Sequence, residues 1–192
     1  MSVLYCEKIK EETAMKITPQ KLTLTALFMG MTILLSTFSI PILTAHFYFC
    51  DTAIYTAAIL LADPVLAFIV GGVGTFLADM MFYPQSMFVS LFAHGLQAVA
   101  AALCVRYLLP KKPAVSALIG MIIGSIIMII GFTFGRAFVY STIESALLKL
   151  PGESLQAAFG TATAYLLCFG LSPQHRHGLL KLYHSKFASD QA

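Results

Sequence analysis

Polar side chains that could bind a ligand lie within or beside the long apolar stretches of this chain. Carboxylate, carboxamide, imidazole and guanidinium groups are costly at membrane depth, and where they occur there they commonly serve a function. With nearby aromatic rings they offer hydrogen bonds, ion pairs and stacking, which is the chemistry of recognising a small molecule. The candidate ligand-binding residues are Asp51, Asp79, Tyr83, His94, Gln97, Phe132, Arg136, Tyr140, Glu153 and Gln156.

Structural roles compete with ligand binding for several of these residues. Arg136 could pair with Asp79 or Glu153 and lock a helix bundle, and Asp51 could cap a helix. A guanidinium that faces a ligand would instead favour a carboxylate or a phosphate, because it donates two parallel hydrogen bonds. The sequence leaves both interpretations open.

Catalytic or metal chemistry has little support in the sequence. Ser90 and His94 lie one helical turn apart, but no glycine-flanked nucleophile or third orienting residue accompanies them. The four cysteines have no metal-ligand spacing, and His175 and His177 lie in a basic terminal segment. We therefore expect no catalytic residue, no metal site and no cofactor held by this chain.

The composition shows which elements must position the polar residues. Only 11% of the 192 residues are charged and 58% are hydrophobic, whereas soluble domains carry roughly 25% charged residues. Since a membrane span needs about 20 apolar residues, this length admits about five to seven helices and no sizeable aqueous domain. The net charge is +3, but the basic residues lie where membrane topology would place them, so nucleic-acid binding is not expected.

The number of spans depends on one ambiguous region, residues 52–82. It could be one long span or two short ones broken at Asp63 and Pro64, because proline disfavours helix in the residue before it. Short helices of this kind are tolerated where protein or a water-filled cavity lies beside them, which makes a cavity plausible. The clear apolar stretches are residues 22–43, 87–109, 114–140 and 155–171.

The positions of the basic residues resolve this ambiguity. Ten of the twelve Lys and Arg residues fall within residues 8–21, 106–112 and 176–186, and such clusters favour the cytoplasmic side. An even number of spans must then separate the first two clusters, so the ambiguous region crosses twice or not at all. We take two crossings. The sequence predicts an all-α integral membrane protein with six transmembrane helices and both termini in the cytoplasm.

Three segments follow from this topology. Residues 1–21 are predicted to be a cytoplasmic tail, residues 22–172 the six-helix binding domain, and residues 173–192 a basic cytoplasmic tail near anionic lipid headgroups.

Pairs of small residues four positions apart recur along the chain. Such pairs let helix backbones approach closely. Packing inside one bundle explains most of them, but the first pair could form a groove for the helix of another protein. The pairs are Ala26 with Gly30, Gly120 with Gly124, and Gly131 with Gly135; Gly71, Gly72 and Gly74 are interpreted in the same way.

Three motifs in a fixed order carry a resemblance to a known family. Residues 46–61 read HFYFCDTAIYTAAILL, residues 71–79 read GGVGTFLAD, and residues 150–156 read LPGESLQ. Between about residue 21 and residue 171 the chain resembles the substrate-binding S components of energy-coupling factor (ECF) vitamin transporters. It is most similar to the branch assigned to hydroxymethylpyrimidine or pyridoxine.

The resemblance implies a six-helix protein of the bacterial plasma membrane that binds a vitamin outside and delivers it inward. Its expected partners are the lipid bilayer, a transmembrane coupling protein and two ATPases, which would hydrolyse ATP because this chain has no Walker motif. Ala26 and Gly30 match the small-residue pair that the family uses against the coupling protein, with glycine in place of the usual second alanine. The family's pocket would fall on the outer loop before Asp51, the fourth to sixth helices and the turn at residues 151–152.

Three departures from the family pattern affect the expected cargo. This chain has His94 where a lysine is expected, Arg136 where an acid is expected, and Glu153 where an asparagine is usual. A free Arg136 would make an anionic vitamin such as pantothenate an alternative, whereas an Arg136–Glu153 pair would keep a neutral ligand possible. Two interpretations from other classes also stay open: a small membrane enzyme acting on a lipid, and an assembly subunit without a ligand.

Overall fold

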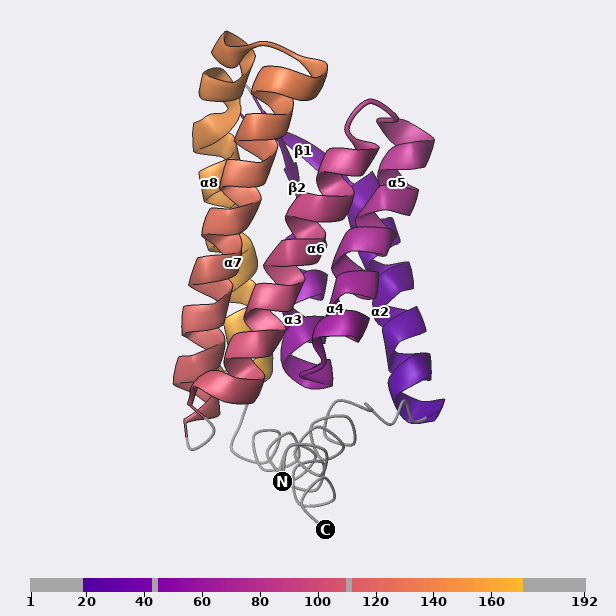
Figure 1. Cartoon of the computed structure of the whole chain (residues 1–192), viewed down its shortest axis with the longest axis vertical. Coiled ribbons are helices and arrows are strands. Elements are labelled where there is room, and N and C mark those ends of the chain that lie inside the picture. The colour runs from indigo at the N-terminus through magenta and orange to yellow at the C-terminus, as the bar shows by residue number, and fades with distance from the viewer. Residues whose placement is uncertain (1–18, 43–44, 110–111, 171–192) are drawn as a thin grey trace, which may run out of the picture.

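A computed structural model describes residues 19–42, 45–109 and 112–170 of the chain (Figure 1). Residues 1–18 of the predicted tail at residues 1–21, and the whole predicted tail at residues 173–192, lie outside the described residues, whereas residues 19–21 belong to the first described helix. Within the described ranges the helices stand side by side as six columns of one bundle (Figure 1). In chain order the columns are α2 (Pro19–Thr37), α3 (Cys50–Leu61), α4 (Pro64–Phe68) with η1 (Ile69–Val73) and α5 (Gly74–Phe82), α6 (Met87–Leu103) with η2 (Cys104–Leu108), α7 (Pro113–Gly135) with η3 (Arg136–Tyr140), and α8 (Ile143–Tyr165) with η4 (Leu166–Gly170).

Three of these columns are long and apolar enough to cross a membrane, judged by length and composition over the described ranges. They are Pro64–Phe82, Met87–Leu108 and Pro113–Tyr140, whereas Cys50–Leu61 is apolar but shorter. The prediction that the third helix is too short for a full span is therefore wrong, because α4, η1 and α5 form one continuous column of 19 residues.

The predicted break at residues 63 and 64 is confirmed. Ala62 ends α3 in a left-handed conformation with φ of 46°. The carboxylate of Asp63 then accepts hydrogen bonds from the backbone N–H groups of Val65 and Leu66, and Pro64 occupies the first turn of α4. An N-cap acid followed by proline starts a new helix efficiently, because the missing N–H of proline needs no partner there.

The first apolar stretch is not helical to its end, which corrects the expected helix over residues 22–43. Helix α2 stops at Thr37, and β1 (Ser39–Ile42) pairs antiparallel with β2 (Ala45–Tyr48), with Ile40 opposite Phe47. Proline at position 41 removes a backbone donor that a helix would need. A hairpin therefore connects α2 to α3.

The sixth helix starts earlier than predicted. Helix α8 begins at Ile143, after Thr142 accepts a hydrogen bond from the backbone N–H of Ser145 at 3.3 Å. It continues through Pro151, so the expected turn at residues 151–152 is wrong. Proline followed by glycine signals a turn in water, but neighbouring helices in a membrane bundle can compensate for the lost hydrogen bond.

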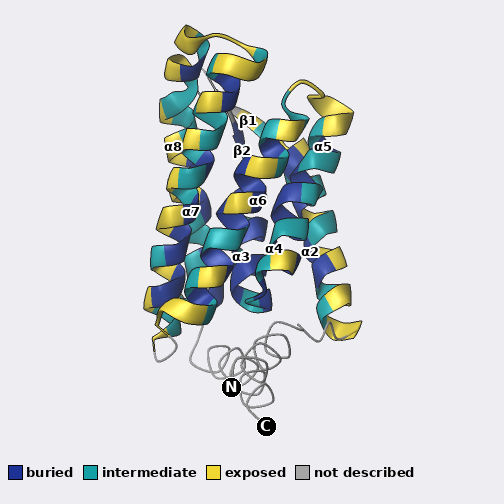
Figure 2. Cartoon of the chain, in the orientation of Figure 1, coloured by how far each residue is buried: buried dark blue, intermediate teal, exposed yellow. Residues whose placement is uncertain are grey.

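The core of the bundle surrounds α3, which contacts α2, α6 and α8. Ile54, Tyr55, Ala57 and Ala58 are fully buried there, and the Tyr55 hydroxyl donates to the backbone carbonyl of Met121 at 2.9 Å. Buried positions face inward on every column and exposed positions face outward (Figure 2). Many exposed side chains are large and apolar, as a lipid-facing surface requires.

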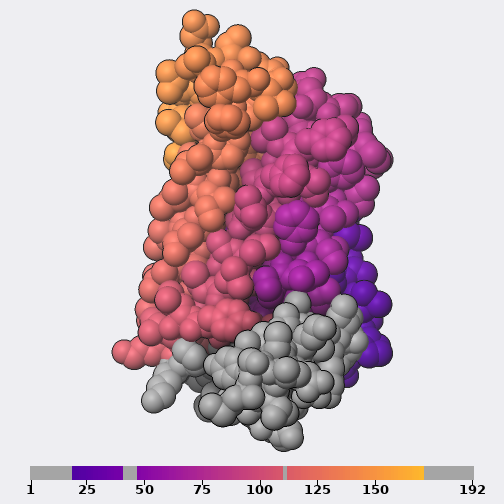
Figure 3. All heavy atoms as spheres, viewed as in Figure 1, coloured from indigo at the N-terminus to yellow at the C-terminus, as the bar shows by residue number. Residues whose placement is uncertain are grey.

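Glycines let α7 approach α6 closely. A Cβ atom built on Gly120 would lie 2.7 Å from Cβ of Cys104, and one built on Gly124 would lie 2.8 Å from the carbonyl oxygen of Gln97. These contacts confirm internal packing for these pairs. In a space-filling view the columns touch along this face, and the ends of α7 and α8 rise beyond the end of α5 (Figure 3).

Candidate ligand-binding site

A pocket of about 160 Å³ lies at the end of the bundle that carries the hairpin. Side chains from α2, β2, α3, α5, α6, α7, η3 and α8 form its wall. Of the predicted ligand-binding residues, those that line it are Asp79, Tyr83, His94, Phe132, Arg136, Tyr140, Glu153 and Gln156. The remaining lining residues were not predicted from the sequence: Ser36, Tyr48, Cys50, Thr75, Gln85, Ser86, Ser90, Met128 and Lys149.

Asp51 and Gln97 do not line the pocket and lie behind its wall. The first turn of α3 places Asp51 between α6 and α8, where its exposure is 0%. Its carboxylate accepts hydrogen bonds from Nε2 of Gln97 at 2.9 Å and from Nε2 of Gln156 at 2.7 Å. The buried charge is therefore satisfied by carboxamides from two other helices, as a buried carboxylate requires.

The two carboxamides extend this network to the pocket wall. Oε1 of Gln97 lies 2.7 Å from Nδ1 of His94, and Nδ1 lies 3.4 Å from the nearer carboxylate oxygen of Asp51. Oε1 of Gln156 accepts a hydrogen bond from the backbone N–H of Tyr48 at 3.1 Å. Asp51 thus links α3, α6, α8 and the hairpin.

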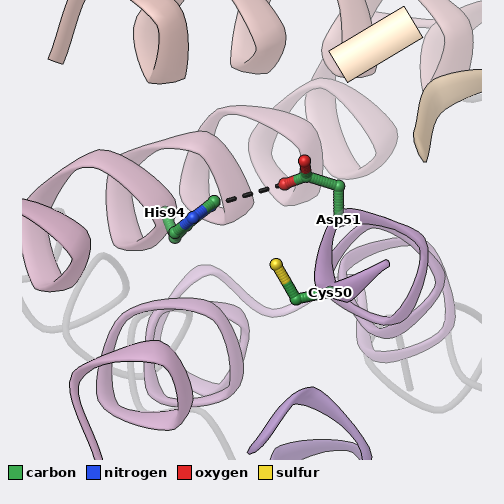
Figure 4. Close-up of side chains that lie close together, drawn as sticks. All are labelled: Cys50, Asp51 and His94. Carbon is green, nitrogen blue, oxygen red and sulfur yellow. Dashed lines mark ion pairs between the residues drawn. The ribbon is translucent and has the colours of Figure 1, made fainter. Parts of the chain in front are cut away.

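Cys50, Asp51 and His94 form a cluster of potential metal ligands that the sequence analysis did not anticipate. Their ligand atoms all lie within 4.8 Å of one another, with His94 facing Asp51 and the Cys50 sulfur beside them (Figure 4). A bound zinc ion would need ligand distances of about 2.0 to 2.3 Å. The carboxylate oxygens already receive N–H groups and Nδ1 contacts a carboxamide oxygen, so this arrangement suits a hydrogen-bond network better than a metal.

Arg136 and Glu153 form an ion pair in the pocket wall. Arg136 comes from η3 and Glu153 from α8, and both side chains are 11% exposed. This is the internal pair that the sequence analysis left open. Nε of Arg136 and Oε2 of Glu153 are buried and have no hydrogen-bond partner among the described residues. The pocket wall therefore keeps one hydrogen-bond donor and one acceptor that a ligand could use.

Asp79 is held by hydroxyl groups instead of by Arg136. Its Oδ2 accepts hydrogen bonds from Ser86 at 2.9 Å and from Ser90. Because Ser90 donates to Asp79, its hydroxyl is not directed at His94 as a nucleophile–base pair would require.

Aromatic rings form the apolar part of the pocket. Phe132 packs edge-on against His94 with ring centroids 5.1 Å apart, and Tyr48 packs against Tyr83 at 6.4 Å. Burial raises the pKa of the Tyr48 hydroxyl, with a further contribution from Tyr83. Tyr48 therefore stays neutral and can donate or accept a hydrogen bond.

The predicted partner-binding pair does not line the pocket and lies on the outer face of α2. Ala26 is exposed, and a Cβ atom added to Gly30 would meet nothing within 4 Å. Leu27 and Leu34 beside them are 59% and 61% exposed. Among the described residues nothing covers this face.

The fold and the pocket define a class of protein: a small helical membrane protein with a ligand-sized cavity at one end of its bundle. A family model described as "ECF-type riboflavin transporter, S component" matches residues 16–172. The chain therefore belongs to this family of S components, which are membrane-embedded substrate-binding subunits of ECF transporters and not enzymes. No curated protein matches the chain. The resemblance to ECF S components is confirmed.

Proposed function

We propose that this S component captures a neutral single-ring vitamin or vitamin precursor, similar to hydroxymethylpyrimidine or pyridoxine, outside the cell and delivers it inward. The observation that carries this proposal is a small pocket whose buried arginine is already neutralised by Glu153.

The size of the pocket favours one ring. A cavity of roughly 150 Å³ in a protein core accommodates a benzene molecule, and this pocket measures about 160 Å³. A substituted pyrimidine or pyridine is of this size. The three fused rings of riboflavin, the vitamin in the family description, would require the pocket to open further.

The charges around the pocket favour a neutral ligand. Asp79 and Glu153 balance Arg136 and Lys149 along the lining, and the carboxylate of Asp51 lies directly behind it. An anion such as pantothenate would meet no excess of positive charge. It remains the second candidate because Nε of Arg136 has no partner among the described residues.

The distribution of basic residues supports a pocket that opens to the outside. Lys21 at the start of α2, Arg106 in η2 and Lys112 before α7 lie at the end of the bundle opposite the hairpin (Figure 1). By the positive-inside rule this end faces the cytoplasm. We therefore propose six spans in the bacterial plasma membrane with both termini inside.

The small-residue pair on α2 supports a docking role. Small residues let a partner helix approach closely in lipid, and Ala26 and Gly30 present an open outward face. We propose that this face binds the transmembrane coupling protein, and that two separate ATPases supply the energy.

The experiment is a thermal-shift and calorimetric screen of the purified full chain in detergent. The compounds are hydroxymethylpyrimidine, pyridoxine, thiamine, pantothenate and riboflavin. A ligand at 100 times its Kd stabilises the folded state by about 2.7 kcal/mol, and we expect this effect from hydroxymethylpyrimidine or pyridoxine. Stabilisation by pantothenate or riboflavin alone would overturn the proposed substrate class, and a folded chain that binds nothing would favour the assembly-subunit interpretation.

A matched variant tests the charge argument directly. Glu153→Gln keeps the shape of the side chain but removes the charge that neutralises Arg136. We expect weaker binding of the neutral ligand and a measurable gain for pantothenate, because the guanidinium becomes available to a carboxylate. Unchanged preference would show that the ion pair does not set the ligand charge.

A further inference from the structure

The buried carboxylate of Asp51 lies outside the pocket, yet its hydrogen bonds connect it to side chains of the pocket wall. Asp51 is completely buried, and its contacts reach the pocket directly through Gln156 on α8 and, on α6, through Gln97 and His94. An ionised carboxylate at this depth is costly, and a simple packing role would be served by an apolar residue of the same size.

The chemistry of each group fixes the direction of every hydrogen bond in this relay. A carboxylate only accepts, so Gln97 must turn its NH2 group to Asp51 and its Oε1 to His94. Since Oε1 also only accepts, the hydrogen between Gln97 and His94 belongs to Nδ1 of the imidazole. When the ring is neutral, its lone pair therefore lies on Nε2.

Nε2 is the atom of His94 that is available to a ligand. His94 is part of the pocket lining, its Nδ1 edge is attached to Gln97 and Asp51, and no group within the described ranges hydrogen-bonds Nε2. Phe132 packs against the ring at 5.1 Å and restricts its rotation. A ligand in the pocket therefore meets a rigid acceptor.

We propose that Asp51 is a positioning residue that acts through Gln97 to hold His94 with Nδ1 protonated and Nε2 directed at the ligand. The ligand class follows from this arrangement: a ring that carries a hydroxyl or amino group able to donate a hydrogen bond to Nε2. This specificity rests on the proposed function of the pocket, whereas the positioning of the imidazole does not.

A spectroscopic experiment on the ligand-free chain tests the positioning alone. Nitrogen NMR of the full chain, labelled with ¹⁵N-histidine in detergent, reports which imidazole nitrogen carries the proton, and His94→Ala identifies the signal. We expect the Nδ1–H form in the wild type and a mixture in Asp51→Asn, because an asparagine no longer forces Gln97 into one orientation. An Nε2–H form or a doubly protonated ring in the wild type, or an unchanged spectrum in Asp51→Asn, would overturn the proposal even if no ligand had been found.

Ligand affinity tests the consequence for binding. With pyridoxine or hydroxymethylpyrimidine, whichever binds more tightly, we expect Asp51→Asn to raise Kd by at least about tenfold, the effect of leaving one buried polar group poorly paired. Asp63→Asn is the matched control, because it makes the same change at a buried residue whose hydrogen bonds cap α4. Asparagine also caps helices well, so Kd should not change.

A double-mutant cycle separates positioning from direct contact. If Asp51 acts through His94, Asp51→Asn has little further effect on Kd in a His94→Ala background. Additive effects of the two changes would show that Asp51 contributes independently and would overturn the proposal.

A second variant covers the case in which Asp51→Asn does not fold. Gln97→Met removes the bridging carboxamide at similar volume, and we expect a several-fold increase in Kd because Nδ1 loses its acceptor at 2.7 Å. Wild-type affinity in Gln97→Met would exclude the relay.

Discussion

Helices α2 and α7 both carry small residues four positions apart, but the two helices use them differently. On α7, Gly120 and Gly124 face α6, and an added Cβ would lie within 3 Å of atoms there. On α2, Ala26 is exposed and Gly30 has open space around it. The same sequence pattern therefore marks a closed contact inside the subunit in one helix and an open face in the other.

The difference shows what stabilises each region. Helices in lipid associate mainly through close van der Waals packing and hydrogen bonds. The contact between α6 and α7 already has this packing, so a larger side chain there must separate the helices. The outer face of α2 can gain the same packing only from another molecule, so a larger side chain there disturbs assembly and leaves the fold intact.

The largest expected effect is the loss of the folded subunit on introducing Gly124→Leu. The first carbon of the new side chain would lie 2.8 Å from the Gln97 carbonyl oxygen and 3.3 Å from the Tyr55 ring. Overpacking usually lowers the free energy of unfolding by about 1 to 3 kcal/mol and occasionally by more. The leucine side chain would press against backbone that cannot move aside, so we expect a cost at the upper end. We expect aggregation or no cooperative melt in detergent. A normal melting curve would show that α6 and α7 can separate without penalty.

The next largest expected effect is a loss of transport, without a loss of folding or ligand binding, in Ala26→Leu. The side chain would fill the open face of α2, so the assembled transporter should lose uptake while ligand affinity and melting temperature stay at wild-type values. Ala158→Leu on α8 makes the same change at another exposed position and should retain uptake. If Ala26→Leu transported normally, this face of α2 would not be the docking site.

A smaller effect is expected for Gly120→Ala between α6 and α7. One methyl group would lie 2.7 Å from Cβ of Cys104 and 3.0 Å from the Ala101 carbonyl oxygen. We expect a destabilisation of about 1 to 2 kcal/mol, since overpacking exceeds the gain in helix propensity of about 1 kcal/mol. Chemical denaturation in mixed micelles measures it. An increase in stability would mean that the contact is looser than the distances indicate.

Local chemistry made part of the fold predictable from sequence. Asp63 followed by Pro64 specifies a helix start through backbone donors and acceptors alone, and the break occurs there. The hairpin after Thr37 and the continuous α8 through Pro151 could not be read in this way. Both depend on how neighbouring elements compensate a proline, and that information is not local.

The sequence predicted many of the residues that belong to the candidate site, but not which of them face the pocket and which lie behind its wall. Polar residues within or beside the apolar stretches identified His94, Arg136 and Glu153, because such groups are expensive in a membrane. Residue type could not tell that Asp51 lies behind the wall, or that Tyr48 belongs to it, since side-chain direction depends on packing between helices. The spacing of small residues has the same limit as a signal. It does not distinguish the open face at Ala26 from the internal contact at Gly120, because the difference depends on neighbouring helices.

The smallest expected effect distinguishes the two helices most directly and concerns Gly30→Ala. Nothing lies within 4 Å of the added methyl group, and alanine is more favourable than glycine inside a helix by about 0.5 to 1 kcal/mol. The same substitution that destabilises α7 at Gly120 should therefore stabilise the subunit slightly at Gly30, measured in the same micelles. Transport should persist, because alanine keeps a small residue at the open face. A loss of stability would mean that this face already packs against the subunit itself, and the contrast between α2 and α7 would disappear.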